Sequence, residues 1–238
     1  MNQNRVKQAI KEGRTAIGYR LVFPSPWIVE VLGRLDFDYV WIDGEHGPFS
    51  LDQIEDICRT AEGVGATPIA RVPDIGSSTI LRFLDRGVQG IIGPHIATKS
   101  DAEQLVNACL FGPEGERSFG GNRGSEYAEI ADDEKLEFYR SANKNMLVGA
   151  LLEDKRVIKE LDDILSVPGI DYFDIGHNDF AQSIGYPGES HRQEVQDAMQ
   201  GIYGRVRGAG ARLGIDFMRG EWVTDMLIDA GQDLLSGH

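Results

Sequence analysis

Short apolar runs alternate along the chain with longer segments in which apolar residues recur every three or four positions. The short runs are typical of buried strands, and the longer segments are typical of amphipathic helices. Their alternation predicts repeated βα units around a parallel sheet. The predicted strands cover residues 15–21, 39–43, 67–71, 90–93, 146–152, 172–176, 212–215 and 233–236.

These eight strands predict an α/β fold of the (β/α)8 TIM-barrel type, in one domain covering residues 1–238. An open doubly wound sheet is the alternative, although the chain does not open with a G-x-G-x-x-G segment. Only Gly237 and His238 follow the last predicted strand, so the eighth outer helix is expected to be missing. Another copy of the chain is the expected cover for the apolar flank, which predicts a homo-oligomer.

Composition and charge exclude several classes of partner. The net charge of −14 would repel a phosphate backbone, so nucleic acid is not an expected partner. No apolar run approaches the roughly 18 to 20 residues that a bilayer needs, and residues 1–18 lack a signal-peptide core. A soluble, cytoplasmic protein is therefore expected. Cys58 and Cys109 lie within helical patterns and are expected to be buried as small apolar residues.

Two acidic residues stand where predicted strands end. Glu153 directly follows the fifth run, and Asp179 follows the sixth. Because ligands of parallel α/β folds bind at the carboxyl ends of strands, this pair predicts a divalent metal site. Hard oxygen ligands favour Mg²⁺, Mn²⁺ or Co²⁺, while zinc is not excluded.

A second candidate cluster is Asp43, Gly44, Glu45 and His46, at the end of the second run. Asp43 would accept a hydrogen bond from the His46 imidazole, which would then transfer a proton. The structural alternative is that Asp43 and Glu45 cap the helix beginning near Ser50 and that His46 is an ordinary loop histidine.

Arg71 ends the third run, where its guanidinium would suit a substrate carboxylate or an enolate oxygen. An ion pair between loops is the alternative. Asp85 lies near the end of a helical pattern, where the helix dipole disfavours a negative charge, so a functional reason is expected. The longest irregular stretch, 111–131, contains five glycines and is expected over the barrel mouth or at a subunit contact.

Several motifs together resemble the HpcH/HpaI aldolases, which are class II, metal-dependent pyruvate aldolases such as 4-hydroxy-2-oxoheptanedioate aldolase. The resemblance covers nearly the whole chain. The motifs that carry it are Asp43-Gly44-Glu45-His46, Arg71-Val72-Pro73, Gly112-Pro113-Glu114-Gly115-Glu116-Arg117, Glu153, Gly176-His177-Asn178-Asp179 and Gly185-Tyr186.

The resemblance implies a role for each matching residue. Glu153 and Asp179 would hold the metal, with Asp179 also beside the substrate, and Arg71 would hold the pyruvyl oxygen. His46 with Asp43 would transfer protons.

Glu45 and Asp85 would hold water molecules at the metal. The family resemblance also implies a (β/α)8 barrel that commonly forms hexamers, in which the eighth helix is commonly exchanged between subunits. Its members cleave 4-hydroxy-2-oxo acids to pyruvate and an aldehyde.

Departures from the family pattern point to a different substrate. Leu151 replaces a usual glutamine, His177 and Asn178 replace part of a Gly-Pro-x-Asp turn, and His95 replaces an apolar residue. His95 and His177 would bind a more polar or anionic acceptor, or take part in proton transfer. The alternative is that both histidines only pack against the loops.

The sequence thus predicts a metal-dependent lyase that cleaves a 4-hydroxy-2-oxo acid through a pyruvate enolate. Two other functions remain open. One is an oxaloacetate decarboxylase or condensing enzyme that uses the same enolate, and the other is a non-catalytic barrel that binds a 2-oxo acid.

Overall fold

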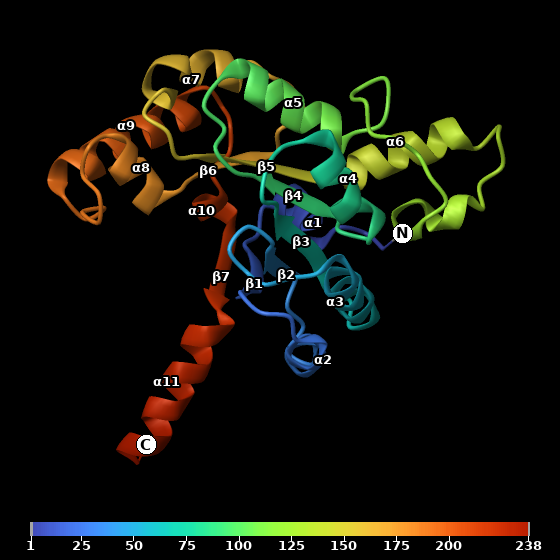
Figure 1. Cartoon of the computed structure of the whole chain (residues 1–238), viewed down its shortest axis with the longest axis horizontal. Coiled ribbons are helices and arrows are strands. Elements are labelled where there is room, and N and C mark those ends of the chain that lie inside the picture. Colours follow the sequence, from blue (N-terminus) through green and yellow to red (C-terminus); the bar gives the residue numbers. More distant parts are fainter. Residues whose placement is uncertain (1, 238) are drawn as a thin grey trace.

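A parallel sheet of seven strands forms the centre of the computed structural model, which describes residues 2–237. The sheet curls, and its strand order is β6-β5-β4-β3-β2-β1-β7 (Figure 1). The strands are β1 Ala16–Leu21, β2 Tyr39–Asp43, β3 Thr67–Arg71, β4 Gly90–Gly93, β5 Leu147–Leu152, β6 Tyr172–Ile175 and β7 Met218–Trp222. The parallel α/β class and the first six predicted strands are confirmed, whereas an eight-stranded barrel is not.

Helices alternate with the strands, and several of them cover the outer face of the sheet (Figure 1). They are α1 Arg5–Glu12, α2 Pro26–Gly33, α3 Leu51–Gly63, α4 Ser77–Asp85, α5 Lys99–Cys109, the 3₁₀ helix η1 Arg123–Ala128, α6 Lys135–Asn145, α7 Val157–Leu165, α8 His177–Ser183, α9 Gln193–Gly208, α10 Gly214–Phe217 and α11 Val223–Ser236. None of the helices within residues 2–237 is both long and apolar enough to cross a membrane.

Alternation along the strands divides the core into two layers. In β2, Val40 and Ile42 pack outward with the helices, whereas Tyr39 and Trp41 face the inside of the curled sheet. Successive side chains of a strand point to opposite faces, so a strand covered on both faces is apolar at nearly every position. The outer layer holds most of the buried side chains, including Cys58 and Cys109, as expected.

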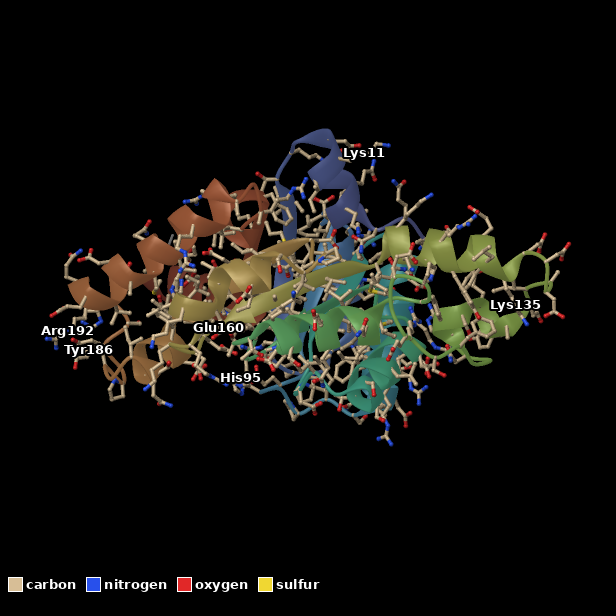
Figure 2. All side chains as sticks on the ribbon, turned by 90° about the horizontal axis from the view of Figure 1, so that it is seen from above. Lys11, His95, Lys135, Glu160, Tyr186 and Arg192 are labelled. Atoms are coloured by element: carbon tan, nitrogen blue, oxygen red, sulfur yellow. The ribbon has the colours of Figure 1, made fainter. Side chains whose placement is uncertain are left out.

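Helix α1 closes the inside of the sheet at the amino ends of the strands. Val6 and Ala9 of α1 pack with the inward side chains of the strands. Lys11 at the end of α1 and His95 after β4 lie on opposite sides of the molecule (Figure 2). The inside of the sheet therefore opens toward the carboxyl ends of the strands, an edge that we call the mouth.

The last two predicted strands are wrong. Within 212–215, only Leu213 pairs, in a single bridge with Phe173 of β6. The backbone then turns into α10, with the Asp174 carboxylate lying where a Cβ of Gly214 would be.

The final strand is instead β7, which pairs in parallel with β1. Burial alternates along β7 and leaves Arg219 and Glu221 exposed. The segment therefore contains no apolar run, and the sequence pattern did not predict a strand there. Residues 233–236 lie in helix α11, which extends away from the body of the protein (Figure 1). A helix therefore does follow β7, although this helix does not cover the sheet.

The glycine-containing stretch 111–131 does not lie over the mouth of its own chain. Its helix η1 packs against α4, and Gly124 allows the backbone to approach the Leu84 carbonyl. Because α4 runs back toward the amino ends of the strands, this stretch lies at the opposite end from the mouth. A subunit contact there remains a prediction.

Candidate active site

A cavity of about 590 Å³ opens at the mouth. It is lined by Arg20, Tyr39, Trp41, His46, Arg71, Ile92, Leu151, Glu153, Tyr172, Asp174, Ile175, Gly176, His177, Asn178, Asp179, Gly214, Ile215, Met218 and Trp222. Five of these residues were predicted from the sequence: Glu153, Asp179, Arg71, His46 and His177. They line one cavity because each lies at or shortly after the carboxyl end of a strand. Aromatic and aliphatic walls with a few polar groups are typical of a small-molecule site.

Glu153 is the most buried carboxylate of the cavity, with 3% of its surface exposed. Its Oε1 accepts a hydrogen bond from the backbone N–H of His95 at 2.8 Å and lies 3.0 Å from His95 Nδ1. His95 Nε2 is 3.4 Å from Glu45 Oε1, so the imidazole bridges two carboxylates. Burial raises the pKa of Glu153, and the nearby Glu45 and Asp179 raise it further. A divalent cation would relieve this accumulation of negative charge.

Asp179 lies in the first turn of α8, directly after the end of β6. The backbone just before α8 passes close to the Glu153 carboxylate, and a Cβ at Gly176 would overlap Glu153 Oε2. A glycine at this position lets the Glu153 carboxylate lie against the backbone that leads to Asp179. The close approach explains why the segment between β6 and α8 begins with glycine.

Arg71 is held by two carboxylates from β2 and the loop after it. Its Nε and Nη2 donate to Asp43 at distances between 2.8 and 3.1 Å, and Nε lies 3.1 Å from Glu45 Oε2. The guanidinium also lies over Trp41, at 5.3 Å from the ring centroid. Arg71 Nη1 has no hydrogen bond to protein within residues 2–237, so it is the donor available to a ligand.

The expected contact between Asp43 and the His46 imidazole is not formed. Asp43 is buried and accepts from the backbone N–H of His46 at 3.2 Å, while its side-chain partner is Arg71. The His46 ring is 65% exposed, and its Nε2 lies 3.9 Å from Glu45 Oε2. Glu45 is therefore the carboxylate nearest the His46 ring in this structure.

The two histidines that depart from the family pattern have different surroundings. His177 Nε2 lies 3.1 Å from the hydroxyl of Tyr203 on α9, and burial lowers the pKa of His177. His95 is 62% exposed and has a left-handed backbone, with φ of 55°. That conformation is uncommon outside glycine, and it is held here by the Glu153 hydrogen bond.

Asp85 lies apart from the cavity, at the end of α4 nearer the amino ends of the strands. Burial raises the pKa of Asp85, and the nearby Arg117 opposes this shift. The geometry of one chain therefore does not bring Asp85 to the predicted metal.

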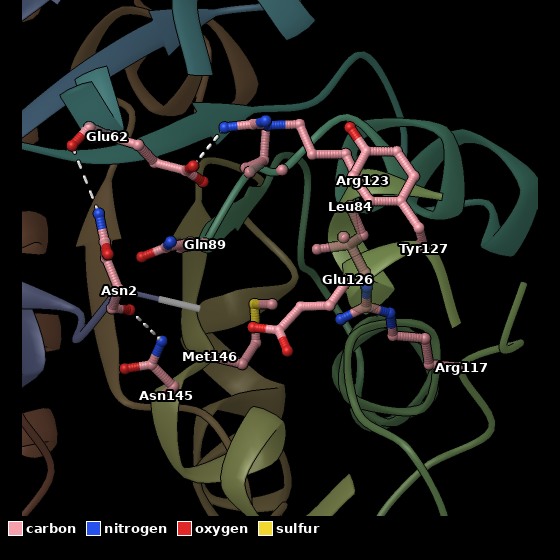
Figure 3. Close-up of a pocket in the computed structure, with 13 residues that line it drawn as sticks. Asn2, Glu62, Leu84, Gln89, Arg117, Arg123, Glu126, Tyr127, Asn145 and Met146 are labelled. Atoms are coloured by element: carbon pink, nitrogen blue, oxygen red, sulfur yellow. Dashed lines mark hydrogen bonds and ion pairs between the residues drawn. The ribbon is translucent and has the colours of Figure 1, made fainter. Parts of the chain in front are cut away.

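A second cavity, of about 260 Å³, lies close to Asp85, where β4 and β5 begin (Figure 3). In it Glu62 pairs with Arg123, and Asn2 donates to the Glu62 carbonyl. It contains none of the predicted site residues, so we do not assign it to the reaction.

Sequence reasoning missed Arg20 and Asp174, which line the mouth cavity from β1 and β6. Each is a charged residue inside an otherwise apolar run, and that interruption was the available signal. Burial raises the pKa of Asp174 to about 7. Asp174 Oδ1 is buried and has no hydrogen-bond partner within residues 2–237.

Glu153 and Asp179 could hold a divalent metal only at a site where water or substrate supplies the remaining ligands. No group of three or more His, Cys, Asp or Glu side chains within residues 2–237 is arranged to hold a metal ion. Glu153 and Asp179 supply hard oxygen ligands, and Mg²⁺ is commonly held by one or two carboxylates with water and substrate completing its shell. The two acids fit this kind of site, which leaves ligand positions free for a substrate.

The fold and this mouth place the chain in the class of parallel α/β proteins with a ligand site at the carboxyl ends of the strands. The chain belongs to the HpcH/HpaI aldolase/citrate lyase family, whose model matches residues 22–223. The resemblance read from the sequence motifs is thereby confirmed.

Relatives with assigned names support the same family. The chain is 33% identical over 216 residues to a 4-hydroxy-2-oxovalerate aldolase of Rhodococcus jostii, covering 89% of this chain and 81% of the relative. It is 34% identical over 215 residues to a hydroxypyruvate/pyruvate aldolase of Rhizorhabdus wittichii, covering 89% and 83%. An HpcH/HpaI aldolase structure from Desulfitobacterium hafniense shares the fold, with a TM-score of 0.86, 20% identity and coverage of 97% and 95%.

Proposed function

We propose that this protein is a divalent-metal-dependent lyase that reversibly cleaves a 4-hydroxy-2-oxo acid to pyruvate and an aldehyde. One observation carries the proposal: Glu153, Asp179 and the free donor of Arg71 meet in one cavity of a chain that belongs to this family. Aldolase names among its relatives support the reaction type.

Glu153 and Asp179 would hold the cation, which when bound supplies Lewis-acid polarisation of the keto group. Arg71 Nη1 would donate to the pyruvyl oxygen, and Asp43 with Glu45 keeps the guanidinium in place. The exposed His46 ring, beside Glu45, would take the proton from the substrate 4-hydroxyl as the C3–C4 bond breaks. The apolar walls formed by Trp41 and Leu151 would limit water at the enolate.

The first prediction concerns the two acids and the pyruvate enolate. Chelated protein with added Mg²⁺, Mn²⁺ or Co²⁺ should exchange the pyruvate methyl protons with deuterated water, followed by NMR. Glu153→Gln and Asp179→Asn should each lower this rate at least about 100-fold, because each removes a charged oxygen ligand.

Asp154→Asn is the matched control, since Asp154 adjoins Glu153 but pairs with Arg156 outside the cavity. This variant should exchange at the wild-type rate. Exchange that needs no metal, or that survives in both ligand variants, would refute the proposed function.

A further inference from the structure

Arg20 packs beside a pair of tryptophans at the mouth, Trp41 and Trp222, whose rings contact each other edge to face with centroids 5.3 Å apart. Parallel pairing places Arg20 of β1 level with Trp41 of β2 on one side and with Trp222 of β7 on the other. The guanidinium carbon is 5.5 Å from the Trp41 ring centroid and 5.4 Å from that of Trp222. Cation–π contact with both rings holds the Arg20 cation in the cavity wall.

No carboxylate neutralises this cation directly. Within residues 2–237, Arg20 has no ion pair within 4.0 Å and donates no hydrogen bond to protein. Asp174 lines the same cavity, and the Arg20 charge opposes the rise of the pKa of Asp174, but the two residues do not form an ion pair. Arg71 differs, because Asp43 and Glu45 both bind it. Arg20 therefore offers all its donors to a ligand.

The two arginines share Trp41 as a neighbour. Their guanidinium carbons lie 5.3 Å and 5.5 Å from the same ring centroid, so their separation cannot exceed the sum of these distances, about 11 Å. Both line the same cavity. A small dicarboxylate can therefore present one carboxylate end near Arg71 and the other to Arg20.

We propose that Arg20 binds the carboxylate of an anionic aldehyde, so that the cleaved substrate is a 4-hydroxy-2-oxo diacid. This inference rests on the proposed function and specifies its substrate class. A guanidinium forms two parallel hydrogen bonds with a carboxylate, and contact with both rings limits the positions that the Arg20 guanidinium can take before a ligand binds. A neutral aldehyde would leave a cation unpaired in the wall, so charge, as well as shape, selects the acceptor.

Matched pairs of aldehydes test the inference in the direction of synthesis from pyruvate. Glyoxylate is compared with glycolaldehyde, and succinic semialdehyde with butanal, as ratios of kcat/KM. Wild-type protein should prefer the anionic member of at least one pair. Arg20→Gln should reduce that ratio roughly 10- to 100-fold, as expected for loss of a charged hydrogen-bond partner.

Arg20→Lys keeps the charge but loses the paired donors, so it should recover part of the preference. Arg82→Gln is the control, because Arg82 is an exposed arginine on α4 outside the cavity, and it should leave the ratio unchanged.

Two outcomes would overturn the inference. One is a wild-type protein without anionic preference, which needs no variant to detect. The other is a folded Arg20→Gln variant in which both members of each pair slow equally. Proton exchange at pyruvate involves no aldehyde, so its presence without anionic preference rejects only the role of Arg20. Its absence rejects the proposed function itself.

Discussion

Asp174, on the inside of the sheet, should make the stability of the fold depend on pH. Burial is the main cause that raises its pKa to about 7. An unfolded aspartate titrates near 4, so between about pH 4 and pH 7 the folded chain keeps a proton that the unfolded chain has lost. The stability contributed by this residue therefore falls as pH rises through that window and levels off above it.

Asp174→Asn should remove this contribution. In urea unfolding of chelated protein, the free energy of unfolding of the wild type should fall relative to that of the variant between pH 4 and pH 7. Asp36→Asn serves as the comparison, because the Asp36 side chain is 86% exposed. Parallel pH profiles for wild type and Asp174→Asn would show that Asp174 titrates normally.

Individual site residues were predictable where position along a strand decides their place. Glu153, Asp179 and Arg71 reach one cavity because parallel strands end at one edge. The partner of Asp43 was not predictable, since the sequence shows His46 three residues away but not Arg71 across the neighbouring strand. The position of Asp85 within one chain was not predictable either, because its helix carries it back to the other end of the sheet, and its role remains a prediction.

Helix α1 depends on an unusual cap. Asn4 is fully buried, and its side chain accepts hydrogen bonds from the backbone N–H groups of Val6 and Lys7 while donating to the Gln89 carbonyl. Its backbone N–H also donates to Asn145 at 2.7 Å. One residue thus both starts the helix and attaches it to the sheet.

Asn4→Ala should lower the free energy of unfolding by about 2 kcal/mol, the upper end for a helix cap, since it also removes one of the two hydrogen bonds that the Gln89 carbonyl accepts. Ser25→Ala is the matched cap variant at α2, where the side chain accepts one hydrogen bond of 3.3 Å, so its loss should be smaller. Equal losses in urea unfolding would mean that the contact of Asn4 with the sheet adds nothing.

Elements with a strong apolar signal were predicted well, and those defined by tertiary contacts were not. Strands β2 to β6 follow apolar runs that are buried at most positions, and β1 follows a mainly apolar run in which Ile17 is exposed. Strand β7 is polar at every second position, and its identity as a strand comes from pairing with β1. The segment 233–236 continues the helical period of α11. The adjacent apolar residues Leu234 and Leu235 resemble a short strand, and this led to the wrong prediction.

At the scale of the molecule, α11 leaves apolar surface uncovered. Leu234 is 81% exposed and Leu235 is 90% exposed, while Leu227 and Ile228 are each more than half exposed. Exposed apolar groups on a helix that extends away from the body favour association, and a second copy of the chain is the partner expected from sequence.

We therefore expect self-association in sedimentation velocity over a range of concentrations. The double substitution Leu234→Gln with Leu235→Gln should weaken it at least about 10-fold, because it removes apolar area from the contact. Leu136→Gln on α6 is the control, since Leu136 is 49% exposed at a different place. A wild-type chain that stays monomeric at every concentration would contradict the expectation.

The segment that joins the two edges of the sheet, between β6 and β7, is the part of the cavity wall that is freest to change in evolution. There the wall consists of the bridge at Leu213 and the short helix α10, and Gly214 and Ile215 from this segment line the cavity. Strand pairing fixes Arg71 in β3 and the end of β5 next to Glu153, whereas no ladder of hydrogen bonds constrains 214–217. Gly214 is held by its close approach to Asp174, but mutational drift at Ile215, which is 55% exposed, can resize the space for the aldehyde while the enolate chemistry is inherited unchanged.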